Sequence, residues 1–179
     1  DNIVIDEAQD ISVAELKLIS AIAGDKPNGL FFAGDIGQRI FRSPFPWKSA
    51  GVDIRGRSRS LKVNYRTSHQ IRSKSDLLLP SRILEADGGE DRRLGVTSVF
   101  HGPKPALQRF EEVGEESAAA NQWLKGLVKE GVAKDEIAVL VRDSSLSKRA
   151  SAVTADLAGV TWHVMHDAKG QEFRAVAII

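Results

Sequence analysis

Two acidic residues follow a short apolar run at the start of the chain. Ile3-Val4-Ile5 leads directly into Asp6 and Glu7. A continuous apolar run is typical of a buried parallel strand, and ligands bind beyond the carboxyl ends of such strands. There, one carboxylate can hold Mg²⁺ and the next can polarise an attacking water. The alternative is an acidic turn that begins a helix, which is the commoner meaning of an isolated Asp-Glu pair.

A second apolar run, residues 30–33, also ends near a carboxylate, Asp35. A helical pattern separates it from the first run, so the two strands are predicted to be neighbours or near neighbours in one sheet. Gln38 follows, and its amide can bond both a phosphate oxygen and a water. A polar turn residue is the alternative for Gln38.

A third segment, residues 64–67, reads Asn-Tyr-Arg-Thr. Tyr65 offers a ring on which a base can stack, and Arg66 offers a charged fork for phosphate. Residues 55–74 around it contain seven basic side chains and no acidic one. This stretch is either a phosphate-facing patch or an ordinary solvated surface.

A fourth segment, residues 166–173, lies between two strand-like runs. Gly170 permits a close approach of the backbone to a ligand. His163 and His166 do not suit a shared metal, because this spacing on a strand points them to opposite faces. In the loop after Gln38, Phe41 and Trp47 lie among basic residues, a pattern that suits stacking on single-stranded bases. Rings that cover the core are the alternative.

The pattern of elements predicts an α/β fold with parallel sheets, because short apolar runs alternate with helical patterns. Ser12 and Glu15 have the form of a capping box, and Ser68 is suited to cap a second helix. The predicted strands are residues 3–5, 30–33, 61–63, 106–110, 137–141, 160–164 and 175–179. The predicted helices follow Ser12 and Ser68 and cover residues 115–130 and 146–157.

Composition narrows the classes of protein. The chain has 179 residues, a net charge of +1, 42% hydrophobic residues and no cysteine. These values indicate a globular protein, exclude disulfides and cysteine-zinc clusters, and fit a cytoplasmic location. No apolar run approaches the length of a membrane span. Because the chain begins and ends within strand-like runs, we expect it to be part of a longer protein.

Taken in order, the four segments resemble motifs of superfamily 1 helicases, specifically the UvrD/Rep/PcrA-like group. Residues 6–10 (Asp-Glu-Ala-Gln-Asp) resemble motif II, and residues 34–41 resemble motif III. Residues 64–67 resemble motif IV, and residues 166–173 resemble motif V. The resemblance covers nearly the whole chain and implies RecA-like parallel sheets flanked by helices, as in P-loop NTPases.

The resemblance also implies a role for each matching residue. Asp6 would bind Mg²⁺, Glu7 would be the catalytic base, and Gln9 and Gln38 would sense the γ-phosphate of ATP. Arg66 would contact the same phosphate from a second domain, and Tyr65 would stack on adenine. The remaining residues would line the nucleotide cleft (Gly170, Glu172) or touch single-stranded DNA (Phe41, Trp47, His166).

The domains implied are residues 1–58, the back of a first RecA-like domain, and residues 59–179, most of a second. The chain contains no Gly-x-x-x-x-Gly-Lys-Ser/Thr phosphate loop. The interval between Arg142 and His166 is too short for the accessory insertion of this group. Val164 and Gln171 replace residues usual in motif V, and an insertion displaces the tryptophan of motif III.

The implied function is that of a fragment of an ATP-dependent DNA helicase or translocase, with ATP and Mg²⁺ as cofactors. Its partner would be single-stranded DNA, with RNA left open and no membrane. The fragment alone is expected to be inactive, because the phosphate loop is missing. Two alternatives remain: a non-catalytic module that binds nucleic acid or protein, and another P-loop NTPase with a chance match at Asp6 and Glu7.

Overall fold

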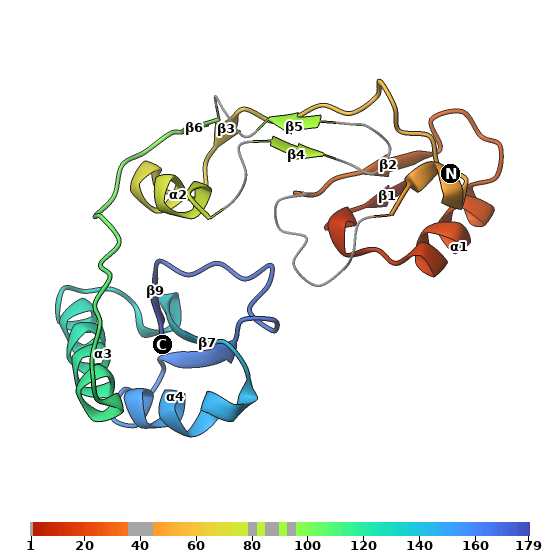
Figure 1. Ribbon diagram of the computed structural model, residues 1–179. Coiled ribbons are helices and arrows are strands. Elements are labelled where there is room, and N and C mark those ends of the chain that lie inside the picture. Colours follow the sequence, from red (N-terminus) through yellow and green to blue (C-terminus); the bar gives the residue numbers. More distant parts are fainter. Residues whose placement is uncertain (1, 36–44, 79–81, 85–89, 93–95) are drawn as a thin grey trace. The chain divides into compact units, whose positions relative to one another are not determined.

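The computed structural model describes residues 2–35, 45–78, 82–84, 90–92 and 96–179. The chain divides into two compact units, Asp1–Ala106 and Leu107–Ile179, called here the first and second units (Figure 1). The predicted boundary near residue 58 falls within the first unit, and the assignment of two RecA-like domains stays a prediction. Among the described segments, no helix combines the length and apolar character needed to cross a bilayer.

Both units contain helices and parallel strand pairs, and the first unit also contains one antiparallel pair. The helices are α1 (Val13–Ala23), α2 (His69–Asp76), α3 (Val113–Lys129) and α4 (Ser147–Thr154). The strands are β1 (Ile3–Ile5), β2 (Leu30–Phe32), β3 (Val63–Asn64), β4 (Arg82–Leu84), β5 (Glu90–Arg92), β6 (Thr97–Ser98), β7 (Ile137–Val141), β8 (Thr161–Val164) and β9 (Ala175–Ile178).

Strands β1 and β2 are parallel neighbours, with Val4 opposite Phe31, and α1 connects them. The predicted capping box is confirmed: Ser12 Oγ accepts from the Glu15 amide at 3.2 Å, and the Glu15 carboxylate accepts from the Ser12 amide at 2.7 Å. This reciprocal pair satisfies two of the amides that a helix start leaves open. The two strands therefore deliver the residues that follow them to the same edge.

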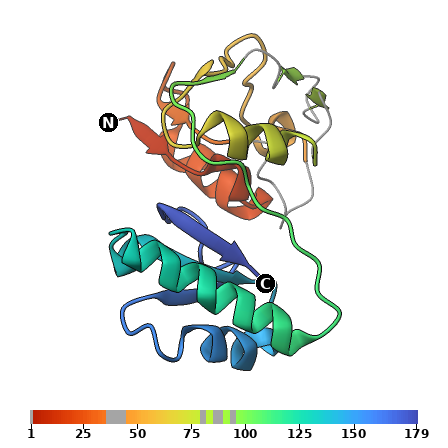
Figure 2. The same ribbon diagram turned by 90° about the vertical axis from the view of Figure 1, so that its left-hand side faces the viewer.

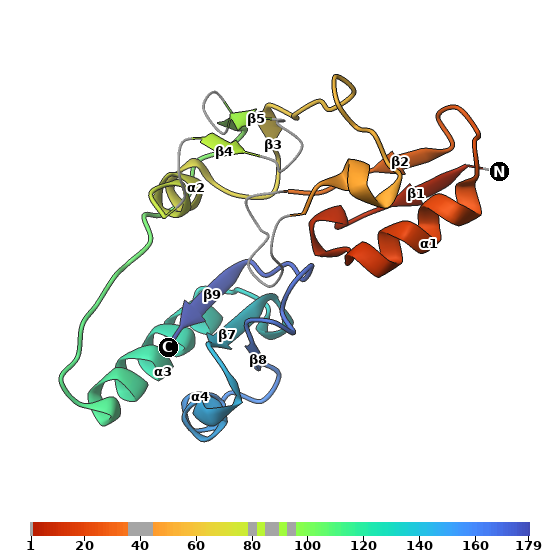
Figure 3. The same ribbon diagram turned by 45° about the vertical axis from the view of Figure 1, so that its right-hand side comes forward.

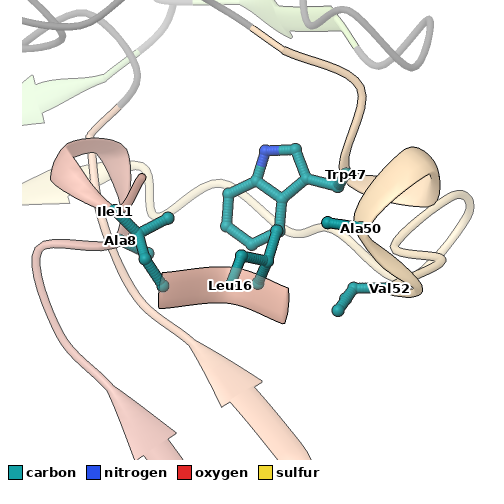
Figure 4. Packing of buried hydrophobic residues seen from close by; sticks show 6 residues of the cluster. All are labelled: Ala8, Ile11, Leu16, Trp47, Ala50 and Val52. Atoms are coloured by element: carbon teal, nitrogen blue, oxygen red, sulfur yellow. The ribbon is translucent and has the colours of Figure 1, made fainter. Parts of the chain in front are cut away.

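A hydrophobic core lies beside this strand pair, and we call it the Trp47 core. Figure 4 shows its buried members, Ala8, Ile11, Leu16, Trp47, Ala50 and Val52. The Trp47 ring meets Phe32 edge-on, with 4.8 Å between ring centroids. Leu16 projects from α1 into this core and is fully buried. The core thus joins α1, β2 and the short 3₁₀ helix Trp47–Ala50 to the turn that follows β1.

The rest of the first unit is built around α2. Strands β3 and β6 pair in parallel, with Val63 opposite Thr97. Strands β4 and β5, which lie between α2 and β6 in the sequence, form an antiparallel pair. Ser68 caps α2 as predicted, its Oγ accepting from the Ile71 amide at 3.4 Å. The His69 amide donates to the Phe100 carbonyl at 3.1 Å, which ties the start of α2 to the chain after β6.

The second unit is a three-stranded parallel sheet in the order β8-β7-β9, with two helices packed on it (Figures 2 and 3). The central strand β7 contributes Ile137 and Val139 to a core that α3 joins through Leu124 and α4 through Val153. All four of these side chains are buried. The Asn121 side chain on α3 donates to the Val153 carbonyl at 2.7 Å, so a polar bond also links the two helices.

Truncation of Leu124 tests how strongly this core holds the second unit together. Leu124 is fully buried, and Leu124→Ala is expected to lower the free energy of unfolding by about 2–5 kcal/mol, since it leaves a cavity between α3 and β7. Leu107→Ala is the matched control, because that side chain is 99% exposed. Its expected change is below about 0.5 kcal/mol. Denaturant unfolding measures both, and equal losses would contradict the assigned core.

The predicted α/β class with parallel strands is confirmed, and the predicted strand 137–141 coincides with β7. The predicted strand at residues 106–110 is wrong, because that stretch has no regular secondary structure. A strand needs a neighbour that completes its hydrogen-bond ladder. Residues 106–110 lack such a neighbour among the described strands, and the Leu107 side chain is exposed.

Candidate active site

The carboxylates of Asp6 and Glu7 lie directly beyond the carboxyl end of β1, and both residues are exposed. The Glu7 amide donates to Asp6 Oδ1 at 2.8 Å. Glu7 has a left-handed backbone, with φ 51° and ψ 39°, and a 3₁₀ turn, Ala8–Asp10, follows it. Residues other than glycine rarely adopt this conformation, and it is most often found where the surrounding structure or a function requires it.

Gln9 links this turn to the chain after β2. Its side chain is buried, at 3% exposed, and Oε1 accepts from the Asp35 amide at 3.0 Å. Its Nε2 donates to Glu7 Oε2. A backbone bond of 2.9 Å from the Ala8 amide to the Ala33 carbonyl runs alongside. The segments that resemble motifs II and III therefore meet at one edge, as the neighbouring strands predicted.

Asn64 shapes the segment around Tyr65 and Arg66. Its Oδ1 accepts from the Arg66 amide at 2.9 Å and from the Thr67 amide at 3.0 Å, which closes a tight turn after β3. The Tyr65 ring is 72% exposed. The turn thus carries an exposed tyrosine and an exposed arginine at consecutive positions of the first unit.

The segment that resembles motif V connects β8 to β9 in the second unit. Gly170 has φ 79°, a conformation that a side chain would strain. Gln171 Nε2 donates to the Asp167 carbonyl at 3.0 Å, which braces the turn. His166 and Glu172 are exposed on this connection. His166 Nδ1 lies 3.5 Å from Asp167 Oδ1.

The aromatic residues predicted to contact DNA differ in their placement. Trp47 is only 7% exposed and its ring packs on Phe32, so the structure favours the alternative of a ring that covers the core. Its position in the loop gave no sign of this, because Phe32, the ring that it meets edge-on, is distant in sequence. Gln38 and Phe41 lie outside the described residues.

Several cations of the basic segment are already engaged within the protein. Arg55 pairs with Asp53, and hydrogen bonds from its side chain and backbone hold the pKa of the Asp53 carboxyl well below its usual range. Arg57 donates to the Asn28 side chain. Arg72 pairs with Asp76 at 3.2 Å. The segment is therefore a mixture of internally bonded cations and exposed ones rather than a uniform patch.

Sequence reasoning missed the part that Gly34 plays at this edge. A side chain at this position would collide with the Gln9 amide and with the backbone of the turn after β1. The available signal was a glycine placed directly after the predicted strand 30–33. Together with Gln9, which follows the two carboxylates, this glycine indicates that the chain after β2 passes close to the turn after β1.

The donor set after β1 suits Mg²⁺. That ion prefers oxygen ligands and is commonly held by one or two carboxylates together with waters and substrate phosphates. Asp6 provides such a carboxylate in an exposed position at the strand end. Over the parts of the chain that the structure describes, three or more His, Asp or Glu side chains nowhere gather as a complete protein metal site.

The fold and the site together define an α/β protein with paired carboxylates at the end of a parallel strand. Comparison with known proteins agrees with the motif order. Residues 1–54 match the model of the UvrD/REP helicase N-terminal domain. A protein of Mycoplasma pneumoniae named a probable DNA helicase is 28% identical over 193 residues, which cover 98% of this chain and 35% of the relative.

These two findings confirm the resemblance to UvrD/Rep-like helicases that the motifs predicted. The family model covers the first strand pair, α1 and the Trp47 core. The similarity to the Mycoplasma protein extends over nearly the whole chain, including the segments that resemble motifs IV and V. The chain spans about a third of the length of that relative.

Proposed function

We propose that this chain is part of an ATP-dependent DNA helicase or translocase of the UvrD-like group, with RecA-like domains that couple ATP hydrolysis to movement on single-stranded DNA. The observation that carries the proposal is the Glu7 carboxylate, which follows β1 and is bonded through Gln9 to the end of β2. This arrangement lies within the residues that match the helicase domain.

In this proposal Asp6 and Glu7 divide the work of hydrolysis. Magnesium bound by Asp6 would neutralise charge on the phosphates of ATP. Glu7 would accept a hydrogen bond from a water and orient it for attack, which suits an exposed carboxylate. Gln9 would hold the Glu7 side chain through its Nε2. Gln38 is proposed to contact the same phosphate.

Other residues are proposed to bind the nucleotide by chemistry suited to its parts. The exposed Tyr65 ring would stack on the base, and the Arg66 fork would bind the γ-phosphate. Gly170 and Glu172 are proposed contacts to the nucleotide. His166 and Phe41 are proposed contacts to single-stranded DNA. Trp47 is assigned to the core, because its ring is buried.

Movement along DNA distinguishes this function from that of a non-catalytic module. The full-length protein is mixed with single-stranded DNA that carries a fluorophore at one end, and the signal is followed in time. With ATP, the delay before the signal changes should grow with strand length, whereas a non-hydrolysable analogue should give no such delay. A fluorescence signal with the same time course in ATP and in the analogue would favour the non-catalytic module.

The isolated chain of 179 residues is proposed to be inactive because it contains no phosphate loop.

DNA binding by the basic segment predicts a marked dependence on salt. For single strands, the logarithm of affinity falls with the logarithm of salt concentration by about 0.7 for each phosphate neutralised. Because the segment keeps exposed cations such as Arg59, a slope of roughly −2 or steeper is expected. Arg59→Gln should flatten the slope. Removing the neutral pair with Asp53→Asn and Arg55→Gln together should leave it unchanged. A flat dependence in the unsubstituted protein would favour a solvated surface.

A further inference from the structure

Gly34 lies where the chain leaves β2 and passes the turn that carries Glu7. A Cβ atom built on Gly34 would lie 3.0 Å from the Ala8 amide nitrogen and 3.2 Å from that of Gln9. It would lie closer still to Gln9 Oε1, well inside the 3.0 Å below which real Cβ contacts are essentially absent. Gly34 is not among the residues with positive φ. Glycine is therefore needed here for space and not for its backbone conformation.

A side chain at residue 34 would displace Gln9 Oε1, and the hydrogen bond to this atom fixes the orientation of the Gln9 side-chain amide. Oε1 accepts from the Asp35 amide at 3.0 Å, and a backbone N–H can be matched only by the oxygen end of the side-chain amide. That assignment turns Nε2 toward Glu7, whose ionised carboxylate can only accept. The orientation of Gln9 at its oxygen end thus dictates the bond at its nitrogen end.

Burial makes this arrangement costly to change. Gln9 is 3% exposed, so an amide that loses the Asp35 partner does not regain water in its place. A buried polar group left without a partner costs about 1–3 kcal/mol. Glu7 is in addition held in a left-handed backbone conformation beside the bond from the Ala8 amide to the Ala33 carbonyl. The Glu7 carboxylate is therefore positioned by Gln9 Nε2, and Gln9 is in turn held by its bond to the Asp35 amide after β2.

We infer that Gly34 is a positioning residue for Glu7 that acts through the Gln9 amide. The inference rests on the proposed function in one respect, the role of Glu7 as the base that orients water. Gly34 itself touches no substrate in this account. Because Gly34 has no side chain, it leaves room for the Gln9 side-chain oxygen. A methyl group at this position would turn the Gln9 side chain away from both Asp35 and Glu7.

Gly34→Ala in the full-length protein is the first test. Displacing Gln9 should speed hydrogen exchange of the Asp35 amide by roughly 2- to 10-fold, because one hydrogen bond is lost. It should also lower kcat for ATP hydrolysis by about 10- to 100-fold, as expected when a reacting group is misplaced. KM for ATP should stay within a few-fold, since Gly34 does not contact the nucleotide. Gly126→Ala, in α3 with open space around its Cβ position, is the control and should change none of the three.

Two further variants separate positioning from general damage to the fold. Gln9→Glu keeps an oxygen for the Asp35 amide but removes the donor to Glu7, so kcat should fall while protection of the Asp35 amide is retained. In a Gln9→Ala background, Gly34→Ala should add little further loss of kcat, because the side chain it displaces is already gone. If Gly34→Ala does not fold, Gln9→Glu still tests whether the bond from Gln9 to Glu7 positions the Glu7 carboxylate.

The outcomes decide the inference without ambiguity. Wild-type kcat in Gly34→Ala, wild-type kcat in Gln9→Glu, or an undiminished effect of Gly34→Ala in the Gln9→Ala background would overturn it. Unchanged exchange of the Asp35 amide in Gly34→Ala would overturn it as well. If the unsubstituted protein hydrolyses no ATP, the proposed function fails. Exchange of the Asp35 amide then still tests whether Gly34 sets the Gln9 bond.

Discussion

Replacing Glu7 by glutamine is expected to slow ATP hydrolysis by the full-length protein about 10²- to 10⁴-fold, the usual contribution of a positioned general base. The variant keeps the size of the side chain but removes the carboxylate that orients water. ATP binding should stay within a few-fold of the unsubstituted protein, because the proposed magnesium ligand Asp6 is retained. Single-turnover hydrolysis and equilibrium binding of a fluorescent ATP analogue measure the two effects separately.

A matched substitution controls for the loss of one negative charge. Glu111→Gln changes an exposed glutamate in the second unit, and hydrolysis should be unaffected. Thermal unfolding of both variants shows whether the fold is kept. Wild-type turnover in Glu7→Gln would remove Glu7 from the role of base. A parallel loss of ATP binding would show that Glu7 contributes to binding the nucleotide and not only to its hydrolysis.

Arg66→Ala is expected to lower kcat for ATP hydrolysis by about 10²- to 10³-fold, the effect of removing one group that stabilises charge in a transition state. The turn after β3 is closed by hydrogen bonds from the Arg66 and Thr67 backbone amides to Asn64 Oδ1. Arg66→Ala keeps both backbone amides, so these two bonds should remain in the variant. Steady-state ATPase activity at saturating DNA and ATP measures the loss.

Arg66→Lys and Arg59→Ala sharpen this experiment. Lysine keeps the charge but not the two-pronged fork, so an intermediate rate is expected. Arg59 lies in the same basic segment and is exposed, but the motif does not include it. Arg59→Ala should leave kcat at saturating DNA unchanged. If Arg66→Ala hydrolyses ATP as fast as Arg59→Ala, the guanidinium does not act on the phosphate.

Elements specified by nearby residues were predictable from the sequence. The capping box needs only Ser12 and Glu15, and both side chains make the expected bonds. The uninterrupted apolar run 137–141 predicted a buried strand, and β7 has these bounds. The single helical pattern between the first two apolar runs also predicted that their strands are neighbours or near neighbours, and β1 and β2 pair in parallel.

Features that depend on partners distant in the sequence were not predictable. Trp47 belongs to the core because Phe32 and Leu16 come to it in the fold, whereas its own neighbours are those of a loop. The need for glycine at position 34 depends on Gln9, whose side chain occupies the space beside it. The left-handed backbone of Glu7 was likewise not apparent from its residue type.

The most direct test of the account is the rate of ATP hydrolysis by the full-length protein with and without single-stranded DNA. We expect magnesium-dependent hydrolysis that single-stranded DNA accelerates by at least about tenfold, because the proposed function makes the nucleotide site and the DNA contacts parts of one coupled motor. Hydrolysis that is absent under both conditions, or that DNA leaves unchanged, would contradict it.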